Sequence, residues 1–536
     1  MGVSKEDRTV RLDRVMVIDT KTMDLDRVLI NLFMLLKHSG SYPVSRTGIV
    51  DRTPKMLADR MCSAPNFVGF AEHPDVVQSW LEADFLDLVN RGRENEALAA
   101  PRPVHLNAYK VRNARHCKDY GAAPQLYRLL SDENDKLPER LRGFLIEGCD
   151  PTTDTFQGGA VDLETLVVLR LADREGRDQP GPERAMPHAP LCPGQGRLLR
   201  NDIRRLLRYS MVIPRPVWVE YFKTLCGLHL ALYVRRLASQ IHAWMGDRSV
   251  TLACRQCPVD PTADEPLADC PFDLEFAVDM GDRLGTHMAM ISQASAERHF
   301  AAMAEFVRDM MGLTKLIQFL DSTGYRAPNT LSLIDQALHV YATDDRDLRG
   351  YCWAKLNTII GSPPDSRMER VRDDFRDDPF RAYVEAILLE CYSFHRGRFR
   401  ELFSSLLSPK HDTGMLVSGR TWRSPIRFHV KTRLLETLVQ IAVLRPAGQD
   451  AAGQPLFKSE PMLVSDLLNW LRRRYGIGVG AAQLSDGIVR SPADLRALRE
   501  NEESFKERLR EIGFYTDLSD AYNAQRVSPR YRVGEQ

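Results

Sequence analysis

Apolar residues recur at helical spacing along most of the chain. In residues 24–38, DLDRVLINLFMLLKH, they lie three and four positions apart, and residues 292–320 repeat the pattern with Phe300, Met303, Phe306 and Met310. One face of an α-helix returns every 3.6 residues, so this spacing predicts helices with a buried face. Further helices are expected in residues 53–90 (two helices), 198–209, 216–244, 330–341, 380–392, 399–407, 428–444, 464–475 and 492–512.

Alternation of apolar and polar residues, which is typical of β-strands, is confined to short stretches. It occurs in residues 10–18 and 104–111, and a strand-like pattern of Tyr, Val and Arg occupies residues 514–533. The sequence therefore predicts a mainly α, multi-domain helical protein with minor β structure.

The length of 536 residues exceeds what one hydrophobic core usually organises. Pro and Gly are dense in residues 173–197, where a regular element cannot persist, and this segment predicts a linker. The N-terminal domain, residues 1–172, is then α-rich with minor β. A long-helix domain with a cysteine-rich loop follows in residues 198–325, and a helical domain in 326–424. Residues 425–536 have the helix, helix, turn and basic-tail order of a winged-helix-like module, an order shared by many unrelated small domains.

Composition adds little to this picture. Apolar residues make up 43% and charged residues 27%, and 73 Lys and Arg balance 72 Asp and Glu for a net charge of +1. Attraction to nucleic acid must therefore come from local basic patches. The charged N-terminus lacks the apolar core of a secretory signal, and no apolar stretch reaches the roughly 20 residues that span a bilayer. A cytoplasmic protein without a membrane partner is expected.

One cysteine cluster departs from the pattern of isolated cysteines. Cys254 and Cys257 form a CxxC turn and Cys270 follows, with Pro directly after Cys257 and Cys270. Such thiolates suit a tetrahedral structural zinc, and Cys192 is the preferred fourth ligand; reduced thiols without metal, or redox chemistry at the CxxC turn, are the alternatives. Other residues considered for the fourth position are Asp273, His188, His242 and His287.

Two groups of arginines suggest contact with DNA phosphates. One group lies on the helix expected at residues 198–209, and the other at the end of the helix expected at 464–475 and in the turns and tail beyond it. Solvated helix faces and capping of a helix carboxyl end explain the same residues without DNA. The candidate contacts are Arg204, Arg205, Arg208, Arg472, Arg473, Arg474, Arg490 and Arg530. The segment HRGR at 395–398 is interpreted as ordinary surface.

Catalytic motifs are absent from the sequence. It has neither a Gly-rich loop ending in Gly-Lys-Ser/Thr, nor a G-x-S-x-G elbow, nor a His-Glu-x-x-His zinc motif. Asp19 follows the apolar run VMVI as the acid of a metal-dependent nuclease strand would, but no second acid accompanies it. The sequence thus favours a protein without catalytic residues of its own.

Three segments carry a resemblance to a known family. They are residues 197–237, RLLRNDIRRLLRYSMVIPRPVWVEYFKTLCGLHLALYVRRL, with 465–477, SDLLNWLRRRYGI, and 500–531. These segments resemble an accessory component of the bacterial methylation-associated defence system and, more distantly, the accessory subunit of phosphorothioation-dependent restriction. The resemblance implies an antiviral role as a subunit beside a partner ATPase or nuclease, on which DNA-dependent chemistry would rest. The leading hypothesis is a non-catalytic accessory subunit that contacts DNA, the partner or both. A metal-dependent nuclease with an unrecognised site and a DNA-binding transcriptional regulator are the alternatives.

Overall fold

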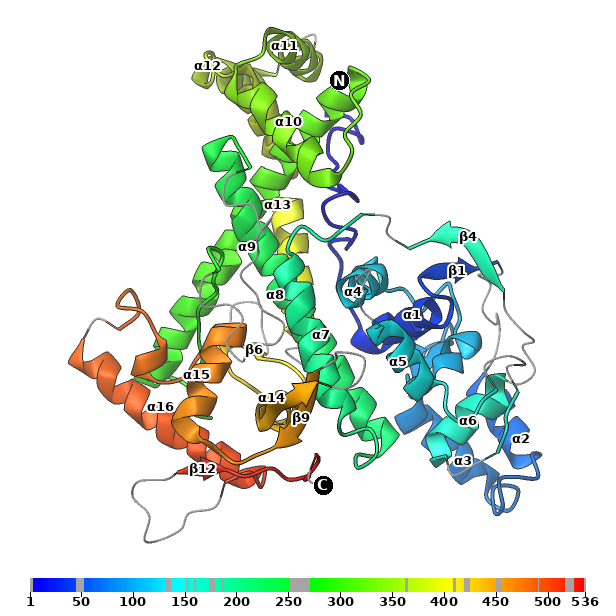
Figure 1. Ribbon diagram of the computed structural model, residues 1–536. Helices are drawn as coiled ribbons and strands as arrows, with labels where there is room; N and C mark the ends of the chain where they lie inside the picture. The colour runs from blue at the N-terminus through cyan, green and yellow to red at the C-terminus, as the bar shows by residue number, and fades with distance from the viewer. Residues whose placement is uncertain are drawn as a thin grey trace.

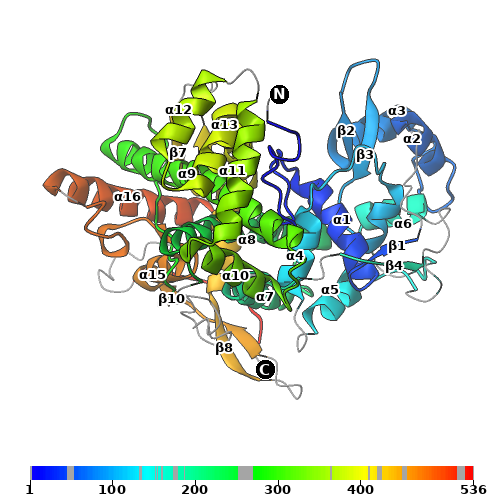
Figure 2. The same cartoon turned by 90° about the horizontal axis from the view of Figure 1, so that it is seen from above.

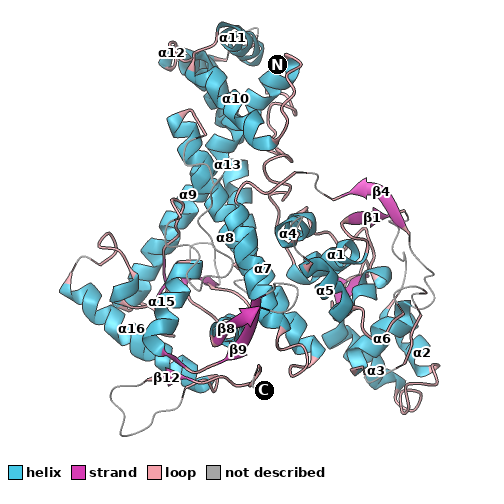
Figure 3. Cartoon of the chain, viewed as in Figure 1, coloured by secondary structure: helices cyan, strands magenta, loops and turns pink. Residues whose placement is uncertain are grey.

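Helices make up most of the computed structural model (Figure 3). The mainly α, multi-domain fold expected from the sequence is therefore confirmed. The structure describes residues 3–44, 53–131, 136–150, 153, 155–158, 161–172, 179–185, 188–250, 270–361, 365–407, 411–418, 425–449, 455–489, 491–515 and 525–534.

The N-terminal part consists of short helices around α1. Helix α1 is capped by Asp24, whose carboxylate accepts hydrogen bonds from the backbone N–H groups of Asp26 and Arg27. The elements are α1 (Leu25–Lys37), β1 (Ser41–Pro43), α2 (Pro54–Cys62), α3 (Pro74–Trp80), the π-helical turn η1 (Leu81–Phe85), β2 (Leu86–Val89), β3 (Ala97–Pro101), the 3₁₀ turn η2 (Leu106–Val111), α4 (Ala122–Leu130), α5 (Leu137–Leu145), α6 (Leu163–Ala172) and β4 (Pro180–Arg184).

Long helices form the centre of the molecule. Helices α8 and α9 pack against each other, with the N-terminal part to one side of them and the C-terminal elements to the other (Figures 1 and 2). Helices α10 to α12 gather near the end of α9, and α13 runs back along α9. The elements are α7 (Pro193–Leu207), α8 (Arg215–Asp247), β5 (Phe276–Ala277), α9 (His287–Ser322), α10 (Thr330–Ala342), α11 (Arg346–Ile360), α12 (Ser366–Asp374) and α13 (Pro379–Leu406).

The C-terminal part packs on α7, α8 and α9. Its β8–β9 hairpin lies in sequence between α14 and α15, and the winged-helix-like module remains a prediction. The elements are β6 (Leu416–Ser418), β7 (Ile426–Phe428), α14 (Thr432–Ala442), β8 (Leu444–Gln449), β9 (Pro455–Ser459), β10 (Met462–Leu463), α15 (Val464–Tyr475), β11 (Ile477–Gly478), η5 (Ala481–Gln483), α16 (Pro492–Glu511) and β12 (Arg526–Val527).

The strands of the described residues pair only two by two. The pairs are β1–β4, β2–β3, β6–β7, β8–β9, β10–β12 and the parallel pair β5–β11. In the parallel pair, Phe276 lies opposite Ile477, so the segment before α9 is bonded to the segment after α15. These small sheets join distant parts of the chain without forming a layer of their own.

A single large cluster of buried apolar residues runs through the molecule. It extends from Val3 to Val527 and includes residues of the N-terminal part, the long helices and the C-terminal part. A second cluster fills the space between α2, α3, η2 and α6. The parts on either side of the predicted linker therefore share a core, while the predicted domain boundaries themselves remain a prediction.

Local structure differs from the sequence expectation at five places. Residues 10–18 are buried at Val10, Val15 and Ile18 but form no strand, because no neighbouring strand pairs with them. Residues 106–111 form a 3₁₀ turn instead of a strand, and of the tail only β12 is a strand within the described residues. The two helices expected in residues 380–407 are one helix, α13. Helix α7 begins at Pro193, inside the predicted linker. A Pro is tolerated in the first turn of a helix, because the N–H group that it lacks would have no partner within the helix.

Candidate nucleic-acid interface

A fully buried polar network joins α7, α8 and α15. The carboxylate of Asp202 on α7 accepts a hydrogen bond from the Tyr475 hydroxyl at 2.7 Å, forms an ion pair with Arg474, and lies 2.9 Å from His229 Nε2. The Gln195 amide nitrogen lies 2.6 Å from His229 Nδ1. If Gln195 donates to Nδ1, the proton of a neutral His229 lies on Nε2 and is donated to Asp202.

The pKa values of this network follow from burial and pairing. Burial raises the pKa of Asp202, but Arg474 and the hydrogen bond from His229 outweigh it and lower the pKa to about 2. Burial lowers the pKa of His229 more than Asp202 raises it. The carboxylate is therefore ionised and the imidazole neutral near pH 7, and the network contains one ion pair with hydrogen-bonded neighbours. These side chains have no exposed surface, so their role is to fix three helices to one another.

Two of the arginines expected to contact DNA belong to the core. Arg474 is 0% exposed within the network, and Arg205 is 1% exposed. Arg205 donates to the side-chain oxygen of Asn201 at 3.0 Å and to the backbone oxygen of Ile441 at 3.2 Å, and it lies over the ring of Phe457. The expected basic surface is therefore interrupted, because these two guanidinium groups satisfy buried acceptors.

The other arginines of the two predicted groups have varied surroundings. Arg472 forms an ion pair with Asp273 at 2.8 Å, and Arg530 forms one with Glu436. Arg204 is half-buried on α7, Arg208 is half-buried at the C-cap of α7, Arg473 is exposed on α15, and Arg490 lies outside the described residues. No common basic face unites them, and DNA contact at these positions remains a prediction.

The predicted zinc ligands are only partly within the described residues. Cys254 and Cys257 lie outside them, Cys270 is half-buried, and Cys192 is buried where it precedes α7. The structural zinc is therefore still a prediction. Of the alternative fourth ligands, His242 bonds to Asp309 at 2.9 Å, His287 bonds to Asp494 at 2.7 Å and Asp273 pairs with Arg472.

The N-terminal carboxylate singled out by the nuclease alternative has a local partner. Asp19 lies 2.9 Å from Lys21, in the loop before α1. Among the residues that the structure describes, no group of three or more His, Cys, Asp and Glu side chains is placed to hold a metal ion.

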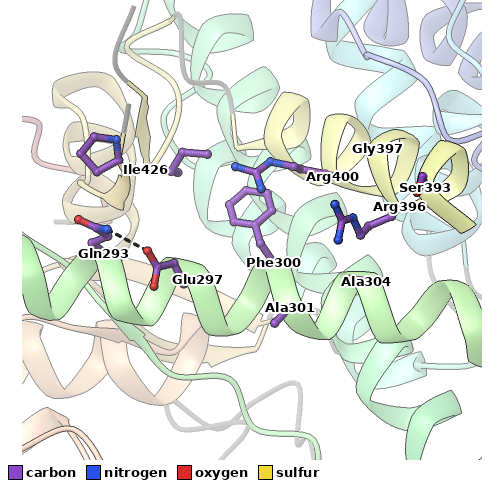
Figure 4. A pocket seen from close by; sticks show the side chains of 11 residues that line it. Gln293, Glu297, Phe300, Ala301, Ala304, Ser393, Arg396, Gly397, Arg400 and Ile426 are labelled. Carbon is purple, nitrogen blue, oxygen red and sulfur yellow. Dashed lines mark hydrogen bonds between the residues drawn. The ribbon is translucent and has the colours of Figure 1, made fainter. Parts of the chain in front are cut away.

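A hollow with a volume of 710 Å³ lies between α9 and α13. Its α9 wall carries Gln293 and Glu297, its α13 wall carries Arg396 and Arg400, and Phe300 lies between them (Figure 4). The remaining lining residues are Ala301, Ala304, Ser393, Gly397, Pro425 and Ile426. We call this hollow the α9–α13 groove.

Helical spacing places the two groove arginines side by side. Arg396 and Arg400 are four residues apart, so their side chains leave α13 on the same face. Arg400 lies over the Phe300 ring with 5.1 Å to its centroid, and Arg396 lies 6.0 Å from the centroid of the Tyr392 ring. Within the described residues, neither guanidinium has a carboxylate within 4.0 Å. The groove therefore has two exposed arginines without a carboxylate partner among the described residues.

Two neighbouring arginines on the same helices are paired with carboxylates. Arg398, on α13 between the two groove arginines, donates to Glu401 at 2.9 Å. Arg308, further along α9, bonds to Glu385 at 2.8 Å. Arg298 on α9 also has no ion pair with a carboxylate among the described residues, so the groove arginines differ from it by lying together on one face of α13.

A second hollow, of 420 Å³, lies where the start of α9 meets α16. Acidic residues outnumber basic ones in its lining, with Arg283 and Arg508 as its two arginines. Arg508 is bonded to Asp282 and Glu511. Phosphate binding is disfavoured here, because the surrounding carboxylates repel an anion.

Sequence reasoning missed the groove arginines. The segment HRGR was interpreted as ordinary surface, yet His395 is buried and lies 2.7 Å from the backbone oxygen of Arg8. The sequence signal that could have indicated these residues is the four-residue spacing of Arg396 and Arg400, which places both on one face of a helix. That spacing could not show that α9 supplies an opposite wall, because the contact between α9 and α13 is formed by residues about a hundred positions apart.

The structure is that of a mainly α-helical, multi-domain protein whose long central helices border the α9–α13 groove. None of the helices in the described part of the chain is both long and apolar enough to cross a bilayer. Residues 5–531 match the family model of methylation-associated defense system protein MAD7, and the chain belongs to that family. Comparison with curated proteins and with solved structures finds no match.

Membership of this family confirms the resemblance seen in three segments of the sequence. The match extends over nearly the whole chain, so the resemblance is not limited to those segments. The protein therefore has a role in antiphage defence.

Proposed function

We propose that this protein is a non-catalytic subunit of an antiphage defence complex and that it holds DNA by its phosphate groups in the α9–α13 groove. Bond-breaking chemistry then belongs to a partner ATPase or nuclease of the same system. Family membership supports a role in defence, and the residues of the groove support the contact with DNA.

The observation that carries this proposal is the pair Arg396 and Arg400. A guanidinium presents several N–H donors in a plane that matches the oxygens of a phosphate. Arginines that already bond a carboxylate would lose that partner on binding DNA, whereas these two have no carboxylate partner among the described residues. Their spacing along one helix face lets both reach the same strand of DNA.

Salt-dependent DNA binding by the full chain tests the proposal. Each phosphate contact contributes about 0.7 to the slope of log affinity against log salt for single strands and about 0.9 for duplex DNA. The double variant Arg396→Gln/Arg400→Gln should therefore bind more weakly, with a slope reduced by roughly 1.4 on single strands. The matched control is Arg398→Gln, which removes a paired arginine from the same helix.

Two results would contradict the proposal that DNA binds in the α9–α13 groove. One is an unchanged affinity and slope in the double variant, and the other is an equal loss in the control. Because the substituted side chains are exposed, a loss of binding is not expected to come from unfolding; the circular dichroism spectrum of each variant checks this.

A further inference from the structure

The two walls of the α9–α13 groove carry opposite hydrogen-bonding groups. On the α13 wall, Arg396 and Arg400 are donors only. On the α9 wall, the Gln293 amide nitrogen donates to Glu297 Oε1 at 2.8 Å. Within the described residues, neither the second carboxylate oxygen of Glu297 nor the amide oxygen of Gln293 accepts a hydrogen bond. The α9 wall thus offers these two acceptor oxygens and the second N–H of the Gln293 amide, and Figure 4 shows the bonded Gln293–Glu297 pair on α9 with Arg396 and Arg400 on α13.

A phosphate group by itself matches only one of these walls. It would bond to the arginines and be repelled by the carboxylate of Glu297. A ligand that is anionic at one end and carries N–H donors at the other matches both walls. The volume of 710 Å³ lies in the range of about 300–1,000 Å³ that is usual for small-molecule sites, so a nucleotide fits whereas a duplex would have to lie across the opening.

We infer that the α9–α13 groove holds one unpaired nucleotide, whose phosphate contacts Arg396 and Arg400 and whose base donates its exocyclic amino group to Glu297 and Gln293. This inference rests on the proposed DNA contact and adds a preference among bases. Phe300, with Arg400 over its ring, forms the floor between the two walls.

The exocyclic amino group of the base determines which base the groove should prefer. Cytosine presents a donor at its N4 amino group, where thymine presents the acceptor O4. An amino group has two hydrogens, one for each acceptor of the α9 wall. The O4 of thymine would face a carboxylate and leave it without a donor. A good pair of base contacts discriminates by about tenfold or more, so cytosine should be favoured by that factor.

The experiment measures binding of fluorescein-labelled oligo(dC) and oligo(dT) of equal length to the full chain at neutral pH. The wild-type protein should bind oligo(dC) about tenfold more tightly. Glu297→Gln should reduce this difference severalfold, because an amide can donate to O4 as well as accept. Glu305→Gln is the matched control, since Glu305 lies on α9 and bonds to Arg308 outside the groove.

The outcomes separate this inference from the proposed function. Equal binding of the two oligonucleotides, or a preference for oligo(dT), overturns the base contact, while the arginine variants still report on the phosphate contact. A preference for oligo(dC) that is unchanged in the Glu297→Gln variant also contradicts the base contact. If neither oligonucleotide nor duplex DNA binds, both the inference and the proposed function fail.

Discussion

Replacing Asp202 by asparagine removes the charge at the centre of the buried network. The side chain keeps its shape, but Arg474 remains fully buried without a counter-charge. Breaking a buried ion pair by removing one partner costs about 3–5 kcal/mol, because the remaining charge is left in a medium that solvates it poorly. We expect Asp202→Asn to lower the free energy of unfolding by that amount.

The lowered pKa of Asp202 reflects the same pairing with Arg474. Its value of about 2 in the folded protein lies below the ordinary value of 3.8. The unfolded chain therefore binds the proton more readily, and the ionised carboxylate contributes roughly 2 kcal/mol of stability. This contribution is complete above pH 3.8 and is lost as the pH falls toward 2. Asp202→Asn should lack this part of the acid destabilisation.

Urea unfolding followed by circular dichroism measures the change in free energy. Asp13→Asn is the control, because Asp13 forms an exposed ion pair with Arg11 and should contribute about 1 kcal/mol or less. Adding Arg474→Met to Asp202→Asn should recover part of the loss, since it removes the stranded cation. A loss below about 1 kcal/mol in Asp202→Asn would refute the reasoning that this network fixes the three helices.

Two further predictions concern the predicted metal site and one turn. Zinc analysis of the purified full chain should find about one zinc per chain and a large decrease in Cys257→Ser; equal zinc in both proteins would remove the proposed structural site. Gly476 has a φ of 75° and lies against the backbone of the segment before α9, so Gly476→Ala should destabilise the protein by more than the roughly 1–2 kcal/mol due to conformation. Gly92→Ala is its control, with a φ of 74° but open space around it; equal losses of thermal stability would show that the close approach does not matter.

The sequence predicted the helices well because their signal is local. The pattern of residues 24–38 and 292–320 identified α1 and most of α9. The helix expected at 492–512 is α16, and the side chain of its N-cap residue, Ser491, accepts a hydrogen bond from the backbone N–H of Asp494. The extent of α13 was less clear, because Gly397 weakens the helical signal while packing against α9 maintains the helix.

Long-range pairing is what the sequence could not predict. The spacing of Arg205 and Arg474 in the sequence is typical of surface cations. In the structure, however, Arg474 forms a buried ion pair with Asp202, which lies 272 positions earlier in the sequence. A buried cation and a DNA-binding cation have the same local pattern. Likewise, Arg396 and Arg400 became a candidate site only when α9 brought Glu297 to the opposite wall.

The central claim is that DNA binds in the α9–α13 groove, and cross-linking locates it most directly. Ultraviolet cross-linking of oligonucleotide-bound full chain, followed by mass spectrometry of the peptides, identifies the residues that touch the bases. We expect cross-linked peptides from the facing segments of α9 and α13, with Phe300 and the Arg396–Arg400 turn among them. Cross-links confined to α7, α15 or the tail would contradict the claim, because the DNA would then lie on the arginine groups first indicated by the sequence.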